Sequence, residues 1–195
     1  MKQALITALL ALFLLFSGCA QGNQPATGTG GNRMANGSII TAQNGDTVRV
    51  DYLGKLENGT VFDTSIAAEA RKANLEPRPS YEPLEFTIGA GQMIPGFDAG
   101  VVGMQEGQEK TVKLIPSQAY GEWSGERVIS IPVENIGNSK DIKVGSMLFA
   151  QNGAVGRVVE IGNGTNASAK VDFNHELAGK TLLFTIKMLS ITKAK

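Results

Sequence analysis

Histidine and cysteine are almost absent from this chain of 195 residues, which contains one of each, His175 and Cys19. A zinc site takes several His or Cys ligands, and a cysteine nucleophile needs a nearby imidazole. Both are excluded because Cys19, as argued below, lies ahead of the folded region. We therefore expect no metal and no cofactor, and any catalysis has to use very few titrating groups.

An excess of charge is also missing, because 18 Lys and Arg side chains face 18 Asp and Glu side chains. A chain with no net charge has no electrostatic footprint for a phosphate backbone, so nucleic acid is not an expected partner. Hydrophobic residues make up 42% of the chain and glycine occurs 24 times. This composition is typical of a globular protein with many turns, too apolar for disorder.

No apolar run is long enough to span a membrane, although one stands at the N-terminus. The uncharged segment 4–16 has thirteen residues, whereas a membrane span takes about 20. It fits the core of a signal peptide. Ser17-Gly18-Cys19 follows and resembles the lipobox of prokaryotic lipoproteins, with Phe16 where that box usually has Leu. The alternatives to a lipoprotein signal are an ordinary cleaved signal peptide with an incidental cysteine and an uncleaved anchor.

The first two segments are therefore predicted as a lipoprotein signal peptide, 1–18, and a flexible tether, 19–44. The tether is rich in Gly, Asn and Thr and cannot bury enough surface to order itself. Cys19 is the predicted lipid attachment point. We expect an extracytoplasmic, membrane-anchored monomer on the periplasmic or cell-surface side.

Alternating apolar residues predict several strands in the remainder of the chain. They cover residues 46–53, 84–88, 110–115 and 181–191, and the Asn58-Gly59 pair predicts a hairpin that returns at Val61 and Phe62. A short helix is expected over 66–74. A second begins at Pro95 and ends near Gly103, with an apolar stripe on one face.

Between residues 122 and 173 the pattern changes to short strand-like runs. These cover 147–151, 157–161 and 170–173 and are separated by Asn-Gly turns. The last strand of the chain is too apolar to stand alone and needs partners from the first half. The middle segment is therefore predicted to be a small β unit inserted into the first domain.

Four stretches of the sequence resemble the FKBP-type peptidyl-prolyl isomerases. They are 48–65, 83–107, Ala119-Tyr120-Gly121 and 174–184, and the run Asn-His-Glu-Leu-Ala-Gly narrows the likeness to the SlyD-like branch. The resemblance implies an α+β fold in which an antiparallel sheet wraps a short helix. It also implies an isomerase domain over 45–121 and 174–195, with an inserted all-β domain, 122–173, in the flap.

The resemblance further implies an apolar pocket that receives a prolyl side chain. Its expected catalytic residues are Tyr52, Phe62, Asp63, Met93, Ile94, Phe97, Tyr120 and Phe184, and Leu84 is an expected substrate-binding residue. Tyr120 would donate its hydroxyl to a substrate carbonyl. Asp63 would polarise a nearby carbonyl or hold Tyr52, and it also suits a plain turn residue. His175 is expected to orient the flap connection rather than to catalyse.

Elementary chemistry agrees with this reading. Rotation about an X–Pro bond is opposed by about 18–20 kcal/mol of amide resonance, and an apolar pocket that favours the twisted amide lowers this barrier without a nucleophile. The predicted function is prolyl isomerisation in unfolded or exported chains, with chaperone activity from the insert. The alternative is a holdase or peptide-binding module without turnover. The expected partners are unfolded or proline-containing polypeptides, and the membrane through the lipid anchor.

Overall fold

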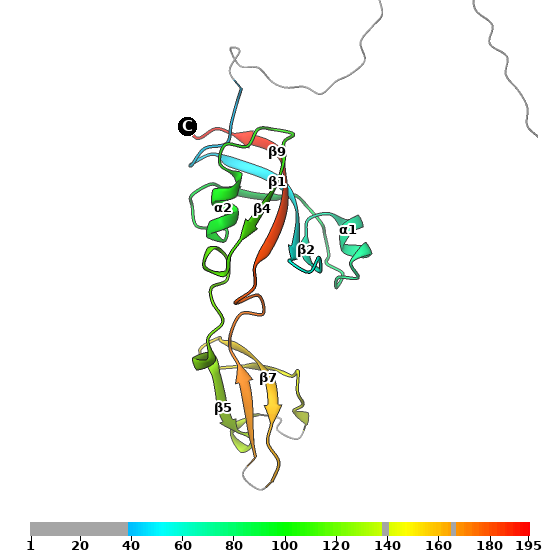
Figure 1. The fold of residues 1–195 in the computed structure, drawn as a ribbon, viewed down its shortest axis with the longest axis vertical. Coiled ribbons are helices and arrows are strands. Elements are labelled where there is room, and N and C mark those ends of the chain that lie inside the picture. The colour runs from blue at the N-terminus through cyan, green and yellow to red at the C-terminus, as the bar shows by residue number, and fades with distance from the viewer. Residues whose placement is uncertain (1–38, 138–140, 165–166) are drawn as a thin grey trace, which may run out of the picture. The chain divides into compact units, whose positions relative to one another are not determined.

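The computed structural model describes residues 39–137, 141–164 and 167–195, so the signal peptide, Cys19 and most of the predicted tether lie outside the described residues. Two antiparallel sheets contain most of the regular secondary structure of the described residues (Figure 1). Within the described ranges, no helix has the length and apolarity needed to cross a bilayer.

The first sheet has five strands and is built around β1, Thr47–Leu56. One edge of β1 pairs with two strands, β3 (Leu84–Thr87) along its first half and β2 (Val61–Thr64) along its second half. Its other edge pairs over its whole length with β9, Leu182–Thr192, which also pairs with β4, Glu109–Leu114. The last strand of the chain is therefore central to the sheet.

Two short helices accompany this sheet. Helix α1, Ala67–Lys72, follows β2, and α2, Pro95–Val101, packs against β4 and β9 with Phe97, Gly100 and Val101 buried (Figure 1). Pro95 begins α2 because its missing N–H would be unpaired in a first turn anyway. The prediction of an antiparallel sheet wrapped on a short helix is confirmed.

The second sheet comprises four strands that lie in the sequence between β4 and β9. They are β5 (Val128–Pro132), β6 (Met147–Phe149), β7 (Val155–Ile161) and β8 (Ser168–Asp172), in the spatial order β5-β8-β7-β6. Strand β5 was not predicted. Its apolar run, Val-Ile-Ser-Ile, is short and ends at Pro132, and proline within such a run weakens the strand signal because it cannot donate a hydrogen bond to a neighbouring strand. Short 3₁₀ turns in the described ranges include Pro116–Gln118, Gly125–Arg127 and Val133–Asn135.

Each sheet has its own apolar core. The core of the five-stranded sheet includes Val48, Phe97 and Ile186, and that of the four-stranded sheet includes Val158 and Val171. The two clusters share no residue. Packing in one unit is therefore separate from packing in the other.

The packed fold begins slightly before the predicted end of the tether. Ala42 is fully buried and exchanges backbone hydrogen bonds with Gly103 and Met104. The buried carboxylate of Asp46 accepts hydrogen bonds from Lys193 Nζ at 2.6 Å and from the backbone N–H of Ala194 at 3.0 Å. These contacts tie the beginning of the fold to the C-terminal segment.

Candidate active site

A pocket of about 400 Å³ opens beside the N-terminus of α2. Half of its lining side chains are aromatic, and the complete lining is Tyr52, Phe62, Asp63, Leu84, Gln92, Met93, Ile94, Phe97, Tyr120 and Phe184. The structure therefore brings together all nine residues that the sequence predicted for the site. Their individual roles in substrate binding and catalysis stay predictions.

Residues far apart in the sequence meet here because β1 and β9 are paired along their length. Tyr52 projects from β1, and Phe184 comes from the strand beside it. Strand β2 supplies Phe62 and Asp63, and the first turn of α2 supplies Phe97. The loop after the 3₁₀ turn 116–118 supplies Tyr120. The pocket is thus built mostly on regular elements that hold its side chains in place.

The floor of the pocket is a set of edge-to-face aromatic rings. Phe97 is 3% exposed, and its ring centroid lies 5.2 Å from that of Phe184 and 6.0 Å from that of Tyr52, both nearly perpendicular. Phe62 meets Phe184 in the same way at 5.5 Å. Each such pair adds about 0.5–1.5 kcal/mol to the free energy gained by burial alone. The floor is therefore both apolar and rigid.

Gly54 in β1 makes this packing possible. A Cβ atom there would lie 2.8 Å from the ring of Phe62 and 3.0 Å from the ring of Phe184. Both rings can pack on the strand because position 54 has no side chain. The sequence analysis missed this residue, although a glycine inside a strand pattern is a recognised signal of close backbone approach.

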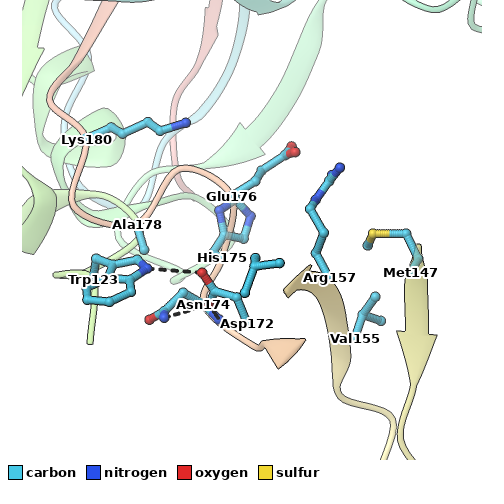
Figure 2. A pocket seen from close by; sticks show the side chains of 11 residues that line it. Trp123, Met147, Val155, Arg157, Asp172, Asn174, His175, Glu176, Ala178 and Lys180 are labelled. Atoms are coloured by element: carbon cyan, nitrogen blue, oxygen red, sulfur yellow. Dashed lines mark hydrogen bonds between the residues drawn. The ribbon is translucent and has the colours of Figure 1, made fainter. Parts of the chain in front are cut away.

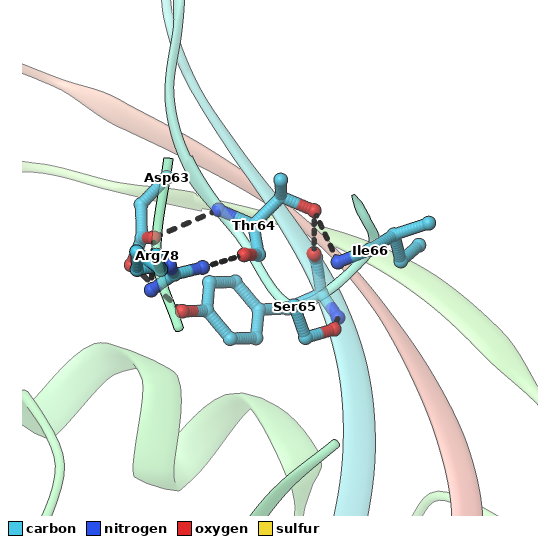
Figure 3. A network of polar contacts seen from close by, with 6 residues as sticks. Asp63, Thr64, Ser65, Ile66 and Arg78 are labelled. Carbon is cyan, nitrogen blue, oxygen red and sulfur yellow. Dashed lines mark hydrogen bonds and ion pairs between the residues drawn. The ribbon is translucent and has the colours of Figure 1, made fainter. Parts of the chain in front are cut away.

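Asp63 organises the polar rim of the pocket. Its Oδ2 accepts a 2.7 Å hydrogen bond from the Tyr52 hydroxyl, and its Oδ1 accepts one of 2.8 Å from the backbone N–H of Thr64. The guanidinium of Arg78 lies 3.1 Å from Oδ1 (Figure 3). Asp63 therefore accepts hydrogen bonds both from Tyr52 and from the backbone of the next residue, Thr64. The expected contact with Tyr52 and the expected local turn contact are both present.

Arg78 is a second residue that the sequence analysis missed. Besides pairing with Asp63 it donates a hydrogen bond to the carbonyl of Thr64 (Figure 3) and lies over the ring of Tyr81, 4.8 Å from its centroid. It stands in a loop between Pro77 and Pro79, without secondary structure of its own. Arg78 reaches the site because this loop folds back onto the end of β2. No local sequence pattern predicts that path.

The two tyrosines of the pocket keep their protons at neutral pH. Burial and the hydrogen bond to Asp63 raise the pKa of Tyr52 to about 12. Burial, with the negative charges of Asp63 and Glu176, also raises the pKa of Tyr120 above its ordinary value. Within the described part of the chain, no residue hydrogen-bonds the Tyr120 hydroxyl. Tyr120 can therefore donate to a bound molecule.

The segments that lead to and from the four-stranded sheet are hydrogen-bonded to each other. The Asn174 side chain accepts from the N–H of Ser124 at 3.0 Å and donates to the Ser124 carbonyl at 2.9 Å, while Trp123 Nε1 donates to Asp172 at 3.1 Å. A cleft of about 710 Å³ lies beside these contacts, and His175 lines it (Figure 2). The ring of His175 also stacks on Tyr120.

Comparison with known proteins identifies the family of this pocket. The family model of the FKBP-type peptidyl-prolyl cis-trans isomerases matches residues 39–189. The chain belongs to this family. It is an FKBP-type isomerase, as the motifs around the pocket predicted.

Curated relatives agree with the family assignment. The chain is 36% identical over 158 residues to the short-type peptidyl-prolyl cis-trans isomerase of Methanocaldococcus jannaschii, which covers 80% of this chain and 98% of that protein. It is 29% identical over 140 residues to SlyD of Helicobacter pylori, covering 70% and 74% of the two chains. It is also 29% identical over 147 residues to SlyD of Treponema pallidum, covering 75% and 76%. The predicted likeness to SlyD is confirmed at the level of sequence homology.

Proposed function

We propose that this FKBP-type isomerase acts on unfolded and newly exported chains, that it catalyses by desolvation in the aromatic pocket, and that residues 122–173 form a chaperone-like insert in the flap. The observation that carries the proposal is the composition of the pocket. Its aromatic floor adjoins one free phenolic donor, Tyr120, and one carboxylate, Asp63, that is occupied by Tyr52 and Arg78.

The mechanism follows from the electronic structure of the amide. Resonance places negative charge on the carbonyl oxygen and is strengthened by water, so transfer into an apolar pocket weakens it. The prolyl ring would rest on Phe97 and Phe184, and the Tyr120 hydroxyl would fix the substrate carbonyl while the C–N bond rotates. Only binding that is stronger in the twisted state accelerates the reaction. No proton transfer and no covalent intermediate is needed.

The exposed apolar side chains of the four-stranded sheet support the chaperone part of the proposal. Phe149 is 79% exposed, and several other large apolar residues of this unit are also open to solvent: Ile129, Val144, Met147, Val155 and Val159. Clusters of exposed apolar side chains are typical of surfaces that bind other proteins. We propose that this surface holds apolar segments of a client while prolines reach the pocket.

The cellular location is proposed from the sequence. The apolar segment 4–16, followed by Ser17-Gly18-Cys19, supports export and lipid attachment at Cys19. The polar segment after Cys19 would tether the domain at a membrane surface on the outer side. Mass spectrometry of the mature N-terminus tests this point, and an unmodified or uncleaved N-terminus contradicts it.

The main test compares two assays on the same set of variants: isomerisation of a prolyl tetrapeptide and proline-limited refolding of a protein. Tyr120→Phe should lower kcat/KM for the peptide by about tenfold, since a hydrogen bond made to the substrate is lost. Phe149→Ser should leave peptide turnover unchanged and reduce the refolding rate. Deletion of 122–173 should act like Phe149→Ser.

Each outcome discriminates between the proposals. Equal loss in both assays for Phe149→Ser would overturn the division of labour between pocket and insert. A wild-type protein that binds the peptide without accelerating its isomerisation would instead favour a holdase.

A further inference from the structure

The only histidine of the chain lies flat against the tyrosine of the pocket. The ring centroids of His175 and Tyr120 are 3.9 Å apart and their planes differ by 4°. Tyr120 is 38% exposed and stands in a loop, so packing alone does not fix its ring. The imidazole covers one face of the phenol and restricts the rotations that would move the hydroxyl away from the pocket.

The imidazole is itself held in place. His175 Nδ1 accepts a 3.1 Å hydrogen bond from the backbone N–H of Leu177, and the His175 carbonyl accepts one of 2.8 Å from Ala178. Leu177 and Ala178 are each 8% exposed and anchor this turn in the apolar interior. Since Nδ1 accepts, the neutral ring carries its proton on Nε2. The ring plane is therefore set by a buried turn.

The two segments that carry the stacked rings are joined on both sides of the stack. The Asn174 side chain bonds both backbone groups of Ser124, and the N–H of Gly179 donates to the carbonyl of Gly121 at 2.8 Å. Figure 2 shows His175 next to Asn174 on the segment that returns from β8. The Asn174 side-chain bonds and the Gly179 backbone bond thus fix the distance between the segments that carry His175 and Tyr120.

We propose that His175 is a positioning residue for the isomerase reaction, which sets the plane of Tyr120 and thereby aims its hydroxyl at the substrate carbonyl. The inference rests on the proposed role of Tyr120. The imidazole does not contact substrate and transfers no proton. Because a misplaced donor is worth far less in the transition state than an aligned one, loss of the stack should lower kcat about three- to tenfold, with KM nearly unchanged.

Two substitutions separate the stack from the turn. His175→Phe keeps a flat ring over Tyr120 and removes the acceptor for Leu177 N–H, whereas His175→Asn keeps an acceptor at this spacing and removes the ring. In the full chain, we expect His175→Asn to show the three- to tenfold fall in kcat for a prolyl tetrapeptide. The decrease in log kcat of His175→Phe should be less than half of the decrease in His175→Asn. The reverse order, or equal loss from both variants, would mean that His175 only supports the turn and would overturn the proposal.

A double-mutant cycle decides whether His175 acts through Tyr120. In a Tyr120→Ala background, His175→Asn should have no further effect on kcat/KM, and independent, multiplying effects overturn the proposal. If Tyr120→Ala alone retains full activity, the proposed role of Tyr120 fails and this inference fails with it. NMR of ¹³C-labelled tyrosine tests the stack separately from activity. The ring-current shift of Tyr120 in wild type should be lost in His175→Asn, whether or not Tyr120 contributes to catalysis.

Discussion

At the scale of single residues, the rim of the pocket depends on one carboxylate with three partners. Asp63 binds the Tyr52 hydroxyl, its own turn and Arg78. These contacts occupy both carboxylate oxygens, Oδ1 with the Thr64 N–H and Arg78 and Oδ2 with the Tyr52 hydroxyl. The carboxylate therefore fixes the positions of Tyr52 and Arg78 at the rim of the pocket.

The contact between Tyr52 and Asp63 can be measured by titration. In wild type Tyr52 should titrate with a pKa of about 12, because burial and the hydrogen bond to Asp63 both oppose the phenolate. Asp63→Asn removes the negative charge, so we expect the Tyr52 pKa to fall while burial keeps it above 10. NMR of ¹³C-labelled tyrosine reports this value. Glu85→Gln, whose carboxylate pairs with Arg49, is the control and should change nothing; an unchanged Tyr52 pKa in Asp63→Asn would mean that the bond is not formed in solution.

At the scale of elements, α2 is placed by glycine rather than by helix propensity. Gly96 lies in its first turn, and a Cβ there would come within 2.5 Å of Leu114 Cδ2 and 3.0 Å of the Gln118 carbonyl oxygen. Leu114 is only 3% exposed, so neighbouring side chains restrict its movement. Close approach of α2 to β4 and to the 116–118 turn brings Phe97 and the Tyr120 loop to the same pocket.

Substitution of Gly96 by alanine tests this packing argument. Propensity alone predicts stabilisation of about 1 kcal/mol, whereas the overlap with Leu114 and Gln118 predicts destabilisation of about 1–3 kcal/mol. We expect the overlap to prevail and kcat/KM for the peptide to fall, because α2 carries Phe97. Urea unfolding gives the free energy of unfolding. The control Ala99→Gly, at an exposed position of the same helix, should lose about 1 kcal/mol and keep its activity; a stabilised Gly96→Ala protein would refute the argument.

At the scale of the whole molecule, the features that could be predicted are those with a local sequence pattern or a family motif. Helix α2, β9 and nine of the ten residues that line the pocket were predicted, because alternation and motif order can be read in a single chain; the tenth lining residue, Gln92, was not. Arg78 and β5 were missed. Arg78 reaches Asp63 through a loop whose path depends on tertiary contacts, and β5 forms only by pairing with β8, some forty residues away in the sequence. Neither contact leaves a local periodic signal.

The separate cores of the two sheets lead to a last prediction about the whole molecule. Val158 is fully buried in the core of the four-stranded sheet, and this core shares no residue with the core of the five-stranded sheet. Val158→Ala removes the equivalent of two methylene groups and leaves a cavity, a loss of about 1–3 kcal/mol. Only the four-stranded unit should lose this energy. Calorimetry should therefore show one transition moved to lower temperature and the other unchanged.

Because the two cores are separate, Val158→Ala should also affect the two activities differently. Above the lowered transition, the Val158→Ala protein should keep its peptide kcat/KM within about twofold of wild type, since ΔΔG values at distant sites are independent, while its refolding activity falls. The neighbouring Val159, 43% exposed on the same strand, is the matched control, and Val159→Ala should leave both transitions in place. A single cooperative transition in which peptide turnover and refolding activity disappear together would show instead that the two units fold as one.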